Sequence, residues 1–168
     1  NFFCHQQGDP DPQQVARWQQ ALAPFYAEFG VSTDAVSNGP GRAPFNAEHA
    51  AILAEFNPAV VSFHFGLPAP ELLARVKATG ANVFASATTV AEAKWLARHG
   101  ADAIIAQGLE AGGHRGHFLN QDLSLQQGTF TLLPQIVAAV DLPVIAAGGI
   151  VDGKGIKAAL ALGASAVQ

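Results

Sequence analysis

The stretch Arg98-His99-Gly100-Ala101-Asp102-Ala103-Ile104 has the form of a turn that joins a helix to a strand. Glycine just beyond a helix supports the left-handed cap that ends it. The small alanine that follows lets the next strand begin at once. The same pattern occurs at residues 78–83 and 161–167. Three such junctions predict a protein built from repeating β/α units.

Apolar runs beside these junctions are predicted to be strands, and the segments between them helices. The strands are expected at residues 59–64, 83–86, 103–107, 143–147 and 166–168, with residues 1–3 as the tail of an earlier strand. Nearly continuous apolar runs are typical of parallel strands buried on both faces. The helices are expected at residues 12–29, 46–56, 70–78, 89–99, from 129 or 131 to 140, and from 152 or 153 to 162. Thr89 and Glu92 form a predicted capping box.

Five or six β/α units without a Rossmann glycine fingerprint favour an α/β fold of the (β/α)8 or TIM-barrel type. A complete barrel needs about 250 residues, so the 168 present are expected to cover its central five to six units as one partial domain, residues 1–168. An open, doubly wound sheet is the alternative, because it would be complete at this length. The chain has no Met and begins and ends in strand-like runs, so we expect an interior piece of a longer polypeptide, with a processed chain as the alternative.

The composition excludes several classes of partner. Apolar residues make up 49% and charged residues 13%, which argues against disorder and for a large buried core. The net charge of −4 and the lack of a basic cluster argue against nucleic acid and anionic membranes. No apolar run is long enough to span a membrane, and no signal peptide is visible. A single cysteine, Cys4, fits a reducing compartment, so we expect a cytoplasmic protein. The oligomeric state stays open.

The sharpest candidate site is the long segment that follows the strand at 103–107. Residues 107–128 exceed an ordinary β/α connection, and long loops in compact domains are usually functional. Gln107 offers both a donor and an acceptor to the edge of a flat heterocycle. His114 lies among four glycines that let backbone approach a ligand. The alternative is a flexible surface loop with incidental histidines.

Two further features are expected at the same rim of the sheet. Gly148 and Gly149 follow a strand and precede a helix, where exposed amides suit a phosphate; a turn needed only for tight packing is the alternative. His64 ends another strand and is expected either to contact substrate or to be a satisfied structural histidine. His99 is expected to be structural, in a helix cap. No metal-ligand spacing, Gly-x-Ser-x-Gly elbow or P-loop is present, so no metal site is expected.

Residues 102–116 resemble the signature of the nitronate monooxygenases, formerly grouped as 2-nitropropane dioxygenases. Residues 61–66 and 143–150 resemble two more motifs of that family, and residues 1–5 are similar to the segment that holds its flavin-contacting Asn. The resemblance runs in order over nearly the whole chain. It implies an FMN-dependent TIM barrel that oxidises alkyl nitronates, or nitroalkanes, with O2 to a carbonyl compound and nitrite.

The resemblance also assigns roles to particular residues. It implies that His114 is the catalytic base and that His64 is a second histidine in the active-site cavity. The implied FMN contacts are Asn1, Gln107, Gly112, Gly113, Gly148, Gly149 and Gln168. Two alternatives stay open. One is an FMN-dependent enoyl-acyl-carrier-protein reductase, which has a similar Gly-Gly-His motif but uses a nicotinamide reductant. The other is an inactive barrel fragment.

Overall fold

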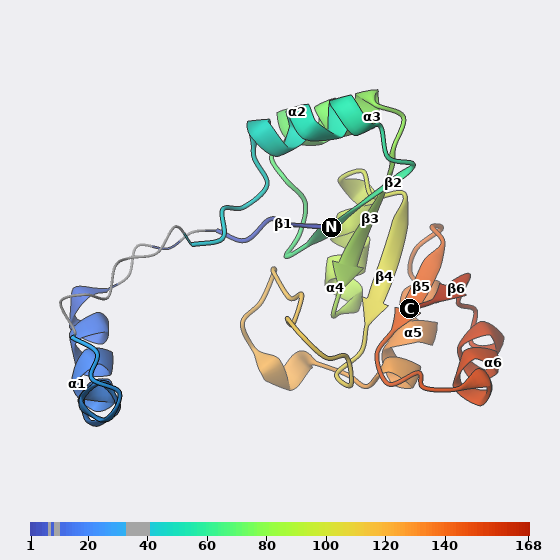
Figure 1. Ribbon diagram of the computed structural model, residues 1–168. Helices are drawn as coiled ribbons and strands as arrows, with labels where there is room; N and C mark the ends of the chain where they lie inside the picture. Colours follow the sequence, from blue (N-terminus) through green and yellow to red (C-terminus); the bar gives the residue numbers. More distant parts are fainter. Residues whose placement is uncertain (7, 9–10, 33–40) are drawn as a thin grey trace. The chain divides into compact units, whose positions relative to one another are not determined.

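The computed structural model describes residues 1–6, 8, 11–32 and 41–168. They form two compact units (Figure 1): residues 6–43, and residues 1–5 together with 44–168. The prediction of a single domain over residues 1–168 stays a prediction.

The larger unit is one sheet of six parallel strands with helices between them (Figure 1). The strands are β1 Phe2–Phe3, β2 Val60–His64, β3 Asn82–Ala87, β4 Ala103–Gln107, β5 Val144–Ala147 and β6 Ala166–Val167. The helices are α2 Ala47–Phe56, α3 Pro70–Ala78, α4 Val90–Arg98, α5 Thr129–Val137 and α6 Gly153–Ala161, with a short 3-10 helix, η2, at Leu123–Leu125. The α/β fold predicted from the repeating junctions is therefore confirmed.

The strand order decides between the two architectures that the sequence left open. Each strand pairs with the next one in the chain, in the order β1-β2-β3-β4-β5-β6. A doubly wound sheet reverses the direction in which strands are added near its middle. This sheet always adds the next strand on the same side, as a barrel does. The open, doubly wound alternative is wrong for these strands.

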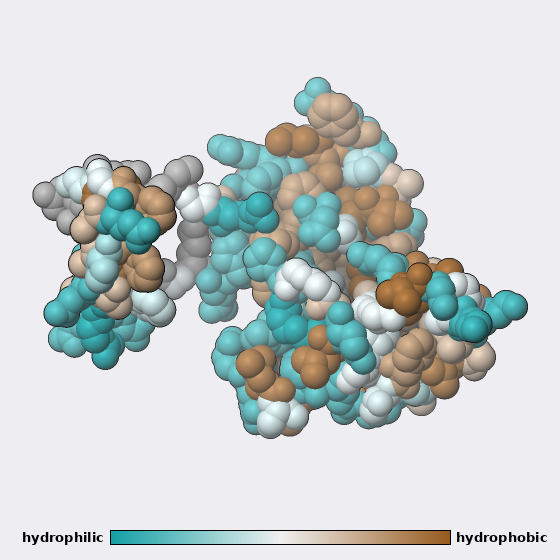
Figure 2. Space-filling model, turned by 60° about the horizontal axis from the view of Figure 1, so that its bottom comes forward, coloured by the Kyte–Doolittle hydropathy of each residue, from teal (hydrophilic) through white to brown (hydrophobic). Residues whose placement is uncertain are grey.

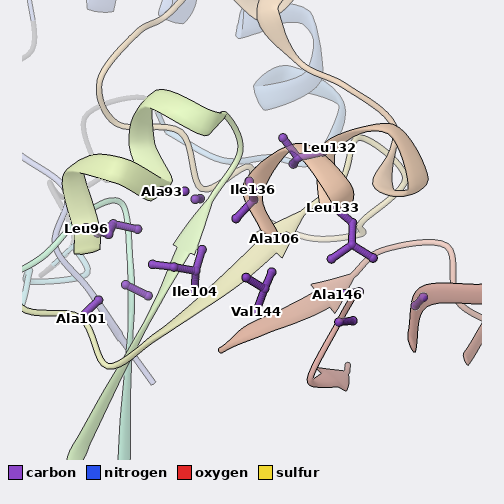
Figure 3. Packing of buried hydrophobic residues seen from close by; sticks show 14 residues of the cluster. Ala93, Leu96, Ala101, Ile104, Ala106, Leu132, Leu133, Ile136, Val144 and Ala146 are labelled. Atoms are coloured by element: carbon purple, nitrogen blue, oxygen red, sulfur yellow. The ribbon is translucent and has the colours of Figure 1, made fainter. Parts of the chain in front are cut away.

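The two faces of the strands have different roles. Ile104, Ala106, Val144 and Ala146 point to one side, where they form a buried cluster with helices α4 and α5 (Figure 3). The helical members are Ala93, Leu96, Leu132, Leu133 and Ile136. Burying a side chain of Leu or Ile size stabilises the fold by about 1.5–3 kcal/mol. The alternate residues, such as Ile105 and Gln107 on β4, point to the other face and line a pocket.

The junction at residues 98–104 forms as predicted. Helix α4 ends at Arg98, and Gly100 has a φ of 104°, in the left-handed region. Asp102 then ties β4 to β3, because its backbone N donates to Val83 O at 2.7 Å and its carboxylate accepts from Val83 N at 2.8 Å. The same carboxylate pairs with Lys77 at 2.9 Å.

Two local details differ from the prediction. Thr89 caps α4, since its hydroxyl accepts from Glu92 N at 3.2 Å, but the Glu92 side chain does not return to complete the capping box. Its carboxylate bonds Thr88 instead. Helix α5 has Gly128 at its N-cap position, where no side chain caps it, and ends at Val137, three residues earlier than predicted.

The smaller unit contains helix α1, Pro12–Glu28. Asp11 caps it by accepting from Gln13 N at 2.9 Å, and Pro12 occupies its first turn, where no amide is needed. None of its residues is buried, and Trp18 and Phe25 are exposed. Figure 2 shows apolar side chains among polar ones on the surface of this unit. Within the described residues, no helix is both long and apolar enough to cross a membrane.

Candidate functional site

A pocket of about 460 Å³ opens at the carboxyl ends of the strands of the larger unit. This volume lies within the range of small-molecule and cofactor sites, about 300–1,000 Å³. The predicted site residues that line it are Asn1, His64, Gln107, Gly112, His114, Gly148, Gly149 and Gln168. Gly113 is not brought to the pocket; its φ of 73° serves the turn just before His114.

Gln107 ends β4 and binds the loop that carries His114. Its Nε2 donates to His114 O at 2.9 Å, and its Oε1 accepts from Gly116 N at 2.7 Å. The amide was expected to offer a donor and an acceptor to a ligand. In this structure it uses one of each on its own loop, while still lining the pocket.

Both ring nitrogens of His64 are occupied by protein groups. Nε2 lies 3.0 Å from His114 O, and since a carbonyl only accepts, Nε2 carries the proton. Nδ1 lies 3.0 Å from Ser86 Oγ, which therefore donates to it. Burial lowers the pKa of His64, and the nearby charges of His114 and Arg115 lower it further, against the effect of the carbonyl hydrogen bond. This geometry favours the satisfied structural histidine of the two alternatives.

His114 is exposed and lines the pocket. Its ring packs edge-on against Phe3 and Phe65, with centroid distances of 5.0 and 6.0 Å. Among the described residues, none forms a hydrogen bond to the ring. Phe65 has a φ of 66°, which costs a residue other than glycine about 1–2 kcal/mol. His114 is thus held by ring contacts and by its backbone, with both ring nitrogens available to a ligand.

Arg115 follows His114 but turns back into the protein. Its Nη2 donates to Gln107 O at 3.0 Å, and its Nη1 donates to Gly108 O. Nε and Nη2 also donate to Gln126 Oε1, at 2.9 and 2.6 Å. A guanidinium engaged in this way holds the end of β4 against the loop and is not directed at the pocket.

The glycine turn after β5 serves packing as well as the pocket. Gly148 and Gly149 have φ values of 116° and 69°. A Cβ on Gly148 would lie 2.7 Å from Ala111 N, so the turn packs directly on the His114 loop. The first amides of α6 are already capped, because Asp152 Oδ1 accepts from the backbone N of residues 154 and 155, each at 2.9 Å. The helix start expected to bind phosphate is therefore not free, and only the turn itself borders the pocket.

The pocket suits a flat, polar-edged cofactor. Amide side chains reach it from Asn1, Gln107 and Gln168, which lie on the first, fourth and last strands or directly beside them. Asn1 Nδ2 donates to Ser62 Oγ at 3.0 Å, which leaves its oxygen to accept. A Cβ on Gly112 would have no neighbour within 4 Å, so the loop leaves open space there. Size and donor set together fit a group such as FMN.

Sequence reasoning missed two residues of the site. Ser86 lines the pocket and donates to His64 Nδ1. The alternation of side chains along the strand predicted at residues 83–86 is the signal that could have placed it there. Phe3 was assigned to a strand but not to the site. In the part of the chain that the structure describes, no three His, Cys, Asp or Glu residues gather as metal ligands would.

Known proteins resemble this chain over its whole length. The family model described as nitronate monooxygenase matches residues 1–168. The nitronate monooxygenases of Paraburkholderia phytofirmans and Pseudomonas aeruginosa are 45% identical over 170 residues and 43% identical over 176. Each match covers 100% of this chain, but 46% and 48% of the relative. The chain spans about half the length of the curated relatives it matches.

A solved structure has a similar fold over this chain. The nitroalkane oxidase from Streptomyces ansochromogenes superposes with a TM-score of 0.84 and 39% identity. The superposition covers 99% of this chain and 47% of that one.

Proposed function

The chain belongs to the nitronate monooxygenase family, and from that membership we propose that it forms part of an enzyme that oxidises alkyl nitronates with O2 to a carbonyl compound and nitrite. The proposal rests above all on the place and the ring nitrogens of His114. This residue lines a cofactor-sized pocket, and neither nitrogen of its ring has a hydrogen-bond partner among the described residues, while His64 and Gln107 bond its backbone carbonyl.

The family is flavin-dependent, and we propose FMN as the cofactor of this pocket. Asn1, Gln107 and Gln168 would bind the polar edge of the ring, and Gly112 leaves space for it. The Gly148–Gly149 turn would approach the phosphate end. Bound FMN supplies the electron transfer to O2, and the protein supplies binding, orientation and a proton site.

His114 has two tasks open to it at this site. A neutral nitroalkane must lose its α-proton, and an unpartnered imidazole nitrogen at the pocket is placed to take it. A nitronate is already deprotonated and anionic, so the imidazolium form would instead hold its charge. Arg115 does not compete for that charge, because its nitrogens are bonded to the carbonyls of Gln107 and Gly108 and to Gln126.

The reaction class is tested on the full-length flavoprotein. We expect O2 uptake with propionate 3-nitronate and release of nitrite, and no comparable oxidation of NADH. Substantial NADH oxidation coupled to an enoyl thioester would instead support the enoyl reductase alternative. A purified chain without flavin absorbance and without O2 uptake would support the inactive fragment.

The role of His114 is tested by His114→Asn beside the control His117→Asn. His117 lies on the same loop but bonds Gln121 and does not line the pocket. We expect His114→Asn to retain flavin and to lower kcat/KM for neutral nitroalkanes by about 100-fold or more, with a much smaller loss for nitronates. The control should match the wild type on both. Equal losses on the two substrate classes would exclude proton abstraction by His114.

A further inference from the structure

A buried carboxylate lies under the loop that carries His114. Glu92, in the first turn of α4, is 1% exposed. Its Oε2 accepts from Thr88 N at 2.7 Å and from Thr88 Oγ1 at 2.8 Å. Its Oε1 accepts from Phe118 N at 2.7 Å and from Leu119 N at 3.2 Å. One side chain thus ties residues 118 and 119 of the loop to the turn between β3 and α4.

A second connection runs from the same turn to Arg115. Gln126 Nε2 donates to Thr88 Oγ1 at 3.1 Å, and Gln126 Oε1 accepts from Arg115. Arg115 in turn donates to the carbonyls of residues 107 and 108, at the end of β4. Glu92, Thr88, Gln126 and Arg115 therefore form one continuous path of hydrogen bonds, which we name the loop brace.

The loop brace holds the residue that directly follows His114. His114 O accepts from both His64 and Gln107. The next residue, Arg115, is anchored to the end of β4 and to Gln126. Together these bonds fix the peptide group that joins His114 to Arg115, and with it the backbone from which the His114 side chain extends.

We propose that the loop brace is a positioning device that sets where the His114 imidazole stands in the pocket, with Arg115 acting as an internal clamp instead of an anion-binding group. The planar fork of Arg suits this task, because it reaches two carbonyls and an amide oxygen at once, whereas Lys offers a single point charge. The link to turnover rests on the proposed role of His114; the link to loop order does not.

The test compares Gln126→Ala with Gln121→Ala in the full-length protein. Both remove an amide from the same loop, but Gln121 bonds His117 and lies outside the loop brace. Hydrogen–deuterium exchange of residues 114–119 is the first readout. We expect exchange there to rise about tenfold or more in Gln126→Ala, with helices and strands unchanged, and to stay at the wild-type rate in Gln121→Ala. Unchanged exchange in Gln126→Ala would overturn the proposal.

Arg115→Lys keeps the charge but loses the fork, and it is the variant to use if Gln126→Ala folds poorly. We expect the same local rise in exchange and a fall in kcat for a neutral nitroalkane, the substrate for which His114 is the proposed base, with KM changed less than about twofold. If Arg115→Lys exchanges and turns over substrate as the wild type does, the proposed clamp role of Arg115 is wrong. If the wild type itself turns over no nitronate but the variants still loosen residues 114–119, the proposed function fails and the loop brace stands.

Discussion

Gly108 is the position where one added methyl group should do most damage. A Cβ there would lie 1.8 Å from Thr129 Oγ1 and 2.4 Å from Thr129 Cα, where ordinary contact begins at 3.4 Å. The loop and the start of α5 must therefore separate by about 1 Å. That movement breaks the bonds that Glu110 accepts from Thr129 N at 2.7 Å and Oγ1 at 2.9 Å.

We expect Gly108→Ala to lower the free energy of unfolding by about 3–5 kcal/mol, because overpacking costs about 1–3 kcal/mol and the two hydrogen bonds to the exposed Glu110 carboxylate contribute about 1 kcal/mol each. The matched control is Gly112→Ala, since that glycine has no neighbour within 4 Å. Urea unfolding followed by circular dichroism measures both. For a chain of this size, a loss of about 3 kcal/mol corresponds to a fall in Tm of about 6–12 °C. A loss below about 1 kcal/mol for Gly108→Ala, or equal losses for both variants, would refute the steric reasoning.

Three further outcomes are expected. Burial holds the pKa of His64 below its ordinary 6.5, so the unfolded chain binds the proton more readily than the folded one. The free energy of unfolding should therefore fall as the pH drops below about 6.5. In urea titrations at several pH values, His64→Gln should remove this pH-dependent loss of stability. Burial raises the pKa of Cys4 from 9.0 to about 12, which lowers its thiolate fraction at pH 8 about 1,000-fold. A disulfide reagent should therefore label Cys4 promptly only when urea unfolds the chain. Equal labelling rates with and without urea would contradict this. Lys77→Ala should lower the free energy of unfolding by about 0.5 kcal/mol, because the side chains of its pair with Asp102 are each 38% exposed. Asp102→Ala should lower it by about 1–2 kcal/mol more, because it also removes the acceptor of the bond from Val83 N. Equal losses for the two variants in denaturant unfolding would show that this bond contributes nothing.

The fold was largely predictable because its signals are local. Helix α3 begins at Pro70 and ends at Ala78, as expected, since proline suits the first turn and glycine follows the end. Asn46 and Asp152 cap their helices through side-chain oxygens that sequence spacing already indicates. His99 is structural as predicted: its ring stacks on Trp95 with a centroid distance of 3.9 Å.

The finer geometry of the site was not predictable because its partners are distant in sequence. Glu92 at the third helical position is typical of a capping box, but its Oε1 accepts from amides 26 and 27 residues later, while its Oε2 accepts from Thr88. Arg115 beside His114 suggests a cation for the substrate, yet its acceptors are the carbonyls at the end of β4 and the side-chain oxygen of Gln126. The local sequence pattern shows that such residues are polar and lie near the site. The direction of their side chains depends on the hydrogen-bond partners that the packed loop brings to them.

The neighbour-by-neighbour order of the sheet also has a consequence for the order of assembly. Phe84 pairs with Ala103, 19 residues away, whereas Phe2 pairs with Phe63, 61 residues away. Closing the longer loop costs about 1 kcal/mol more in chain entropy. The β2–β3 and β5–β6 pairings are nearly as local as β3–β4, so we expect these three pairings to form early and β1 to join late. Because β1 carries Phe3 against His114, the aromatic wall of the pocket would be among the last parts to form and among the first to open.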